Sequence, residues 1–145
     1  MCSSDLIEKG RADGGRVVAG GGSDGEQGFF IEPTVIADVK PGDRVEQEEI
    51  FGPVLACIRA NDFDDALRIA NDTEYGLASY VYTKDLARAL RFAEALQFGI
   101  VGVNDINPTA AAAPFGGVGV SGLGREGGTQ GIDEYLDVKL VGISI

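Results

Sequence analysis

The sequence contains no histidine, no tryptophan and only two cysteines, Cys2 and Cys57. A Ser-His-Asp triad requires a histidine, a structural zinc site requires Cys and His ligands, and a disulfide scaffold requires several cysteines. We therefore expect none of these, and no metal site. Cys57 lies in the apolar stretch 54–58 with no neighbouring cation or histidine to activate it. We expect an inert buried thiol there.

Positive charge is also scarce, because 12 basic residues accompany 23 acidic ones and the net charge is −11. The basic residues are scattered, which argues against nucleic acid as a partner. No apolar run approaches the ~18 residues of a membrane span. No charged-then-apolar leader opens the chain, so we expect no membrane and a cytoplasmic location. A length of 145 residues corresponds to about one domain, which excludes a stand-alone two-domain nicotinamide enzyme.

Residues 1–6, Met-Cys-Ser-Ser-Asp-Leu, resemble the translation of a common sequencing-adapter oligonucleotide. We expect them to be an artefact and leave them out of the fold prediction. Ile7 to Gly10 then has the features of the last turn of a helix, with Gly10 as its C-terminal cap. We expect the natural protein to begin further upstream.

Hydrophobic periodicity predicts an α/β chain. Three strands, 53–59, 78–82 and 100–103, alternate with helices, so right-handed crossovers would place them in one largely parallel sheet. The apolar run 53–59 should be central and buried. The other predicted elements are strands at 16–19, 28–35 (an edge, given Pro33) and 140–145, a helical turn at 43–49, a helix capped by Asn61 or Asp62, a helix capped by Thr83, and a short helix at 132–138.

Glycine is abundant, with 22 residues, and two Gly-x-Gly-x-x-Gly stretches occur at 117–122 and 122–127. A dinucleotide fingerprint follows a strand, opens a helix and has an acid ~20 residues on, whereas Lys139 stands twenty beyond Gly119. We favour a packed glycine loop, and an independent dinucleotide binder remains an alternative that predicts NAD affinity. The acidic stretch 62–65 lacks the glycine and glutamate of a calcium loop and fits a helix cap better.

Three motifs are more specific than this background: Glu48-Glu-Ile-Phe-Gly-Pro, then Asn104 ten residues before Pro114-Phe-Gly-Gly, then Ser121-Gly-Leu-Gly-Arg-Glu-Gly. Taken singly, they fit a solvated helix end and a structural loop. In this order and spacing, they resemble the C-terminal third of the NAD(P)-dependent aldehyde dehydrogenases, over nearly everything from residue 7 onward. The stretch 131–136, followed by Lys139, most resembles succinate-semialdehyde dehydrogenases.

The resemblance implies that Glu49 and Phe51 bind the cofactor, NAD or NADP. Glu49 matches the acid that accepts hydrogen bonds from the nicotinamide ribose hydroxyls, a task suited to an acceptor-only carboxylate. Phe51 matches the aromatic that borders the nicotinamide and orients it for hydride transfer.

The resemblance also implies a substrate wall. Asn104 begins the loop beside the aldehyde pocket, Phe115 lines the channel, and Thr109 keeps a hydroxyl where succinate-semialdehyde enzymes bind the substrate carboxylate. Residues 7–138 would be a partial catalytic domain, and 139–145 the oligomerisation strand of a dimeric or tetrameric parent. Gly119 departs from the family pattern, which usually has lysine there.

The implied parent reaction is aldehyde oxidation, through thiolate attack, hydride transfer to NAD(P) and thioester hydrolysis assisted by a glutamate. The catalytic cysteine and glutamate motifs are absent from these residues, so we expect the fragment alone to be inactive. The rival hypothesis is a non-catalytic binding or assembly module of the same fold. Sequence upstream of residue 7 would distinguish the two.

Overall fold

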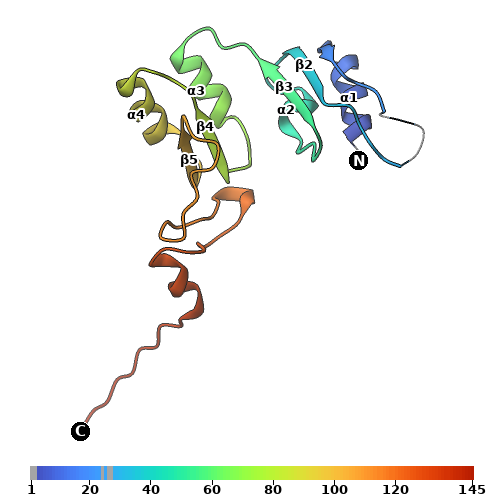
Figure 1. Ribbon diagram of the computed structural model, residues 1–145. Helices are drawn as coiled ribbons and strands as arrows, with labels where there is room; N and C mark the ends of the chain where they lie inside the picture. The colour runs from blue at the N-terminus through green and yellow to red at the C-terminus, as the bar shows by residue number, and fades with distance from the viewer. Residues whose placement is uncertain (1–2, 24, 26–27) are drawn as a thin grey trace. The chain divides into compact units, whose positions relative to one another are not determined.

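The computed structural model describes residues 3–23, 25 and 28–145. Met1 and Cys2 of the stretch that we expect to be an artefact lie outside these residues. The chain divides into two units, Met1–Asp72 and Thr73–Ile145. Figure 1 draws their helices and strands, most of them labelled, and each unit is described by itself below. No helix among the described residues is long and apolar enough to cross a membrane.

The first unit contains a three-stranded sheet in the order β1-β2-β3 (Figure 1). β1 pairs antiparallel with β2, and β2 pairs parallel with β3. Ile36 of β2 is fully buried, and it packs with Leu6, Val39 and Val45 in the core of this unit. The elements are α1 (Ser3–Ala12), β1 (Arg16–Ala19), β2 (Thr34–Val39), α2 (Arg44–Gln47), β3 (Val54–Ile58) and α3 (Phe63–Asn71).

The second unit contains the parallel pair β4-β5, and α4 packs against both strands (Figure 1). Beyond β5 the chain is irregular apart from two short 3-10 helices, so this unit buries few side chains and Ala89 and Leu96 are its buried apolar residues. The elements are β4 (Ala78–Val81), α4 (Leu86–Ala95), β5 (Ile100–Val103), η1 (Gly119–Ser121) and η2 (Gln130–Tyr135).

The prediction of one parallel sheet from 53–59, 78–82 and 100–103 is wrong. β3 is hydrogen-bonded to β2, whereas β4 and β5 form a separate sheet. The strand predicted at 28–35 instead begins at Thr34, because Pro33 has no N–H to donate and the first bond of the ladder runs from the Thr34 N–H to the Pro53 carbonyl. This strand, β2, was expected at an edge but lies in the centre of its sheet. β3 therefore takes the edge position, and Leu55, which we expected to be buried, is 59% exposed.

Two predicted helix boundaries are also wrong. Gly10 lies inside α1, where a Cβ would approach Val45 to 2.8 Å, so this glycine serves close packing and the left-handed residue beyond the helix is Gly14. Asp85 rather than Thr83 caps α4, because its carboxylate accepts the Arg88 N–H bond. Of the two caps expected for α3, Asn61 or Asp62, the structure has Asp62, whose side chain accepts the Asp65 N–H bond at 2.9 Å.

The ends of the chain differ from prediction as well. α1 begins at Ser3 and Leu6 is buried, so residues that we left out of the fold prediction contribute to the core. The short helix expected at 132–138 is the 3-10 helix η2. Residues 140–145 carry no regular structure, because a β-strand requires a hydrogen-bonded neighbour and none pairs with this segment among the described residues.

Candidate functional site

The two adjacent acids after α2 have different surroundings. Glu48 ends α2 and forms an ion pair with Arg44, one helical turn before it. Glu49 is exposed, and its carboxylate makes no hydrogen bond or ion pair with any residue that the structure describes. Glu49 is therefore the acid of this pair that is available to accept hydrogen bonds from a ligand.

Phe51 is held in an unusual conformation two residues further on. Its φ is 54° and its side chain is 89% exposed. A bulky residue in the left-handed region costs about 1–3 kcal/mol, and such strain is concentrated at functional sites. The Gly52-Pro53 pair holds this turn against the start of β3, because the Gly52 carbonyl accepts the Val54 N–H bond at 2.8 Å. The fold thus presents an acid and an aromatic ring two residues apart in the sequence, both exposed.

Asn104 also has a positive φ, 53°, directly after β5. Its side chain accepts the Thr83 N–H bond at 2.9 Å and donates to the Thr83 carbonyl at 2.8 Å. These bonds leave one amide hydrogen and one lone pair of Asn104 for another partner. In this structure Asn104 shapes the start of the loop, and it lies outside the lining of the two hollows described below.

Thr109 and Phe115 are brought together. Both line a hollow of about 470 Å³ in the second unit, with Glu126 and small residues between them. The Thr109 hydroxyl donates to the Asn107 side-chain oxygen at 2.6 Å, which leaves its lone pairs free to accept a bond. This hollow combines an aromatic ring, a hydroxyl and an alanine-lined wall.

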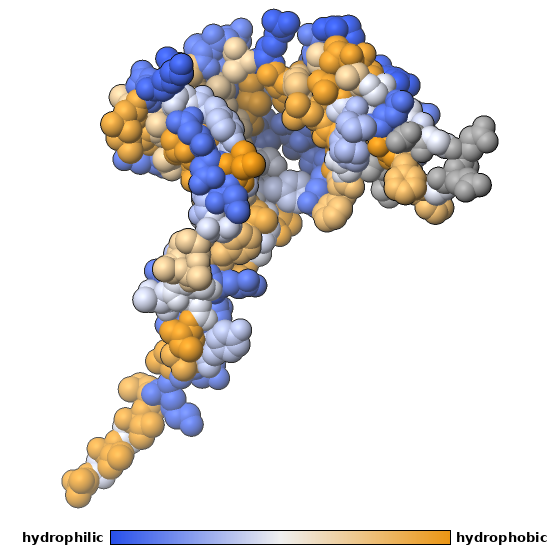
Figure 2. Space-filling model, in the orientation of Figure 1, coloured by the Kyte–Doolittle hydropathy of each residue, from blue (hydrophilic) through white to orange (hydrophobic). Residues whose placement is uncertain are grey.

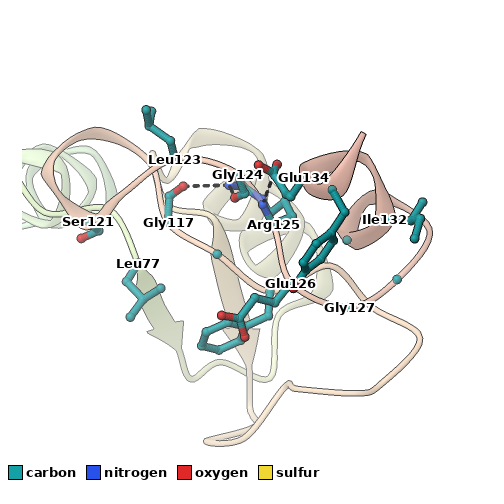
Figure 3. Close-up of a pocket in the computed structure, with 15 residues that line it drawn as sticks. Leu77, Gly117, Ser121, Leu123, Gly124, Arg125, Glu126, Gly127, Ile132 and Glu134 are labelled. Atoms are coloured by element: carbon teal, nitrogen blue, oxygen red, sulfur yellow. Dashed lines mark hydrogen bonds between the residues drawn. The ribbon is translucent and has the colours of Figure 1, made fainter. Parts of the chain in front are cut away.

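A second hollow, of about 860 Å³, is lined by η2 and by residues of the segment 115–126, which we call the glycine loop (Figure 3). Phe115 lines both hollows. Arg125 lies in it, and its guanidinium donates to the Gly117 and Gly124 carbonyls at 2.8 and 2.6 Å. The Arg125 N–H donates to the Glu134 carboxylate at 3.3 Å. Sequence reasoning gave Arg125 and Glu134 no role, since a glycine-rich pattern does not reveal which carbonyls a loop turns inward.

The other sequence interpretations can now be compared with the structure. Neither Gly-x-Gly-x-x-Gly stretch opens an α-helix; the first contains the three-residue η1. This argues against the independent dinucleotide binder. Cys57, in β3, is partly exposed rather than buried. Glu49 and Phe51 belong to Met1–Asp72, and Asn104, Thr109 and Phe115 to Thr73–Ile145.

Each unit combines β-strands with α-helices, so the chain is a piece of an α/β protein. The family model of the aldehyde dehydrogenase family matches residues 3–141. The chain belongs to the aldehyde dehydrogenase family.

Similar proteins support this assignment. The chain is 48% identical over 141 residues to aldehyde dehydrogenase 1A1 of Gallus gallus, covering 97% of this chain and 28% of that protein. It is 45% identical over 142 residues to the NADP(+) succinate-semialdehyde dehydrogenase GabD of Escherichia coli, covering 98% and 29%. The P. syringae indole-3-acetaldehyde dehydrogenase structure in complex with NAD+ matches with a TM-score of 0.90 and 41% identity, covering 94% and 28%.

The relatives are NAD(P)-dependent aldehyde dehydrogenases. The chain spans less than a third of their length. The names of the Escherichia coli and P. syringae relatives state two different aldehydes, succinate semialdehyde and indole-3-acetaldehyde, and that of the Gallus gallus relative states none. The comparisons therefore place the chain in the family without selecting one substrate.

Proposed function

We propose that this chain is the C-terminal part of the catalytic domain of an NAD(P)-dependent aldehyde dehydrogenase, with Glu49 and Phe51 facing the cofactor. The observation that carries the proposal is the contrast between the two acids: Arg44 forms an ion pair with Glu48, whereas Glu49 is exposed and has no partner among the described residues, close to the strained, exposed Phe51. Such a carboxylate fits a pair of ribose hydroxyls, because it can accept two bonds at once.

In the parent enzyme NAD(P) supplies the hydride acceptor. The role of this chain's residues is to bind and orient. The Glu49 carboxylate would accept bonds from the ribose hydroxyls, and the Phe51 ring would limit where the nicotinamide can lie. The reactive thiol and the base come from residues outside this chain, because Cys57 lies within β3 and the other cysteine is Cys2 near the chain start.

For the substrate we propose an aldehyde that carries a carboxylate at its other end, with succinic semialdehyde as the first candidate. The Thr109 hydroxyl would turn from Asn107 and donate its hydrogen to that carboxylate, because an ionised carboxylate can only accept. Phe115, in the same hollow, would pack against the carbon chain. Asn104 would set the position of the loop between them through its bonds to Thr83.

We further propose that the parent is a cytoplasmic homo-oligomer, a dimer or tetramer, in which 139–145 forms a strand with another subunit. The apolar residues Leu140, Val141 and Ile143 of this segment are 67–96% exposed. Hydrophobic atoms, in orange, are prominent along the C-terminal end of the chain in Figure 2. Pairing this segment would satisfy its backbone and cover these side chains.

The test is an assay of the full-length parent and of the 145-residue chain for aldehyde-dependent formation of NADH or NADPH. We expect the parent to oxidise succinic semialdehyde, and the 145-residue chain to show no activity because the thiol and base are absent. A parent without a cysteine motif upstream and without activity on any aldehyde would instead support the assembly-module hypothesis. Turnover by the 145-residue chain would contradict the assignment of catalysis to missing residues.

A further inference from the structure

Phe115 stands at the base of a closed loop. The backbones of Phe115 and Glu126 pair through two reciprocal hydrogen bonds of 2.7 Å, which close the segment 115–126 into one unit. Inside the loop, the Arg125 guanidinium donates to the Gly117 carbonyl at 2.8 Å (Figure 3). The base of the loop, which carries the Phe115 side chain, is therefore fixed by two backbone bonds and by the Arg125 side chain.

The far end of the loop is fixed by Ser121. The Ser121 Oγ accepts a part-buried hydrogen bond from the Gly76 N–H at 2.9 Å, across 45 residues of sequence. The Gly76 carbonyl in turn accepts the Val118 N–H bond at 3.0 Å. Both backbone groups of Gly76, just before β4, are thus bonded to the loop that carries Phe115.

The loop also packs directly on backbone at this place. A Cβ on Gly76 would lie 2.7 Å from the Val118 carbonyl oxygen, and a Cβ on Gly99 would lie 1.8 Å from the Gly116 oxygen. No side chain fits between the loop and the residues that precede β4 and β5. The Val118 and Val120 N–H groups donate to the Gly76 and Glu74 carbonyls at 3.0 and 3.3 Å, so loss of the Ser121 bond would loosen this end of the loop without releasing it.

We infer that Ser121 is a positioning residue for substrate binding: its bond to Gly76 holds the glycine loop against β4 and so fixes the orientation of Phe115 in the substrate hollow. This inference deepens the proposed function and rests on it for the part that concerns the substrate. Ser121 itself does not line the hollow that contains Thr109.

The experiment uses the full-length parent with Ser121→Ala, Ser121→Thr and Val120→Ala. Threonine keeps the accepting oxygen. Val120 lies in the same 3-10 turn and is 62% exposed, so its truncation is the matched control. Two quantities are measured: amide hydrogen exchange at Gly76 and Val118, and KM for the aldehyde alongside kcat.

For Ser121→Ala we expect about fivefold faster exchange at Gly76 and a KM for the aldehyde raised by a similar factor, with kcat little changed. Ser121→Thr and Val120→Ala should match the wild type in both. If the amides of Gly76 and Val118 exchange in Ser121→Ala at the same rate as in the wild type, the inference is overturned, whether or not the parent is active. Equal KM increases in Ser121→Ala and Val120→Ala, or a failure of threonine to restore KM, also overturn it. Absence of any aldehyde oxidation by the wild-type parent contradicts the proposed function instead, and exchange still decides the role of Ser121.

Discussion

The Asn104 side chain fixes the start of the loop that follows β5, so its replacement should lower the stability of the protein. Replacement by alanine removes both side-chain bonds to Thr83, at 2.9 and 2.8 Å, and leaves a residue with a Cβ at φ 53°. Two hydrogen bonds contribute about 1–3 kcal/mol together, and the loss of asparagine's tolerance for this conformation adds about 1 kcal/mol. Thr83 is half-buried, but its bonds to Asn104 are exposed to solvent, so water can satisfy its freed groups. We therefore expect a total loss at the lower end of the combined range, about 2 kcal/mol.

The assay is denaturant unfolding of the full-length parent with Asn104→Ala, Asn104→Gly and Asn104→Asp. Glycine adopts a positive φ without strain, so Asn104→Gly should lower the free energy of unfolding by about 1 kcal/mol less than Asn104→Ala does. The loss that remains in the glycine variant measures the contribution of the two hydrogen bonds. Aspartate keeps the acceptor for the Thr83 N–H but loses the donor, so it should lie between wild type and alanine. Wild-type stability of the alanine variant would refute this reasoning, and equal losses with glycine and alanine would show that backbone conformation makes no contribution.

Three further predictions concern α3 and the glycine contacts. Asp62→Ala removes the cap of α3 and should lower the free energy of unfolding by about 1 kcal/mol, as measured by denaturant titration; an unchanged midpoint would contradict the cap. Hydrogen bonds from the Asn61 backbone, then from the Arg68 side chain, hold the pKa of Asp65 below its ordinary value, so its stabilisation of α3 should be present at neutral pH and be lost as pH falls below about 4. Asp65→Asn should remove that part of the pH dependence of helix content, and an identical acid titration would count against it. Gly99→Ala should destabilise by about 1–3 kcal/mol, because its Cβ would collide with the Gly116 carbonyl oxygen, and a wild-type melting temperature would exclude this close approach.

Local elements were predictable because short-range chemistry determines them. The strand 16–19, the helix after Asp62 and the parallel pair near 78 and 100 follow from hydrophobic spacing and capping residues. Strand pairing was not predictable in the same way. The position of β3 depends on whether the preceding strand is an edge or a centre, and Pro33 marks a strand start as readily as an edge.

The candidate site was predictable only through the family motifs. Composition does not show which of the adjacent acids, Glu48 or Glu49, is available to a ligand. The difference appears in the structure, where α2 brings Arg44 beside Glu48 and the two form an ion pair. The role of Ser121 depends on a bond across 45 residues, which no local pattern signals. The strain at Phe51 likewise requires the three-dimensional turn.

The assignment of Glu49 to the cofactor is tested most directly by the affinity of the full-length parent for NAD(P), measured by titration for Glu49→Gln and for the matched Glu48→Gln. Loss of the charge from bonds to the ribose hydroxyls should weaken binding about tenfold in Glu49→Gln. Glu48→Gln loses only its exposed ion pair with Arg44 and should bind as tightly as the wild type. Wild-type affinity in Glu49→Gln, or equal weakening in both variants, would contradict a cofactor-facing Glu49.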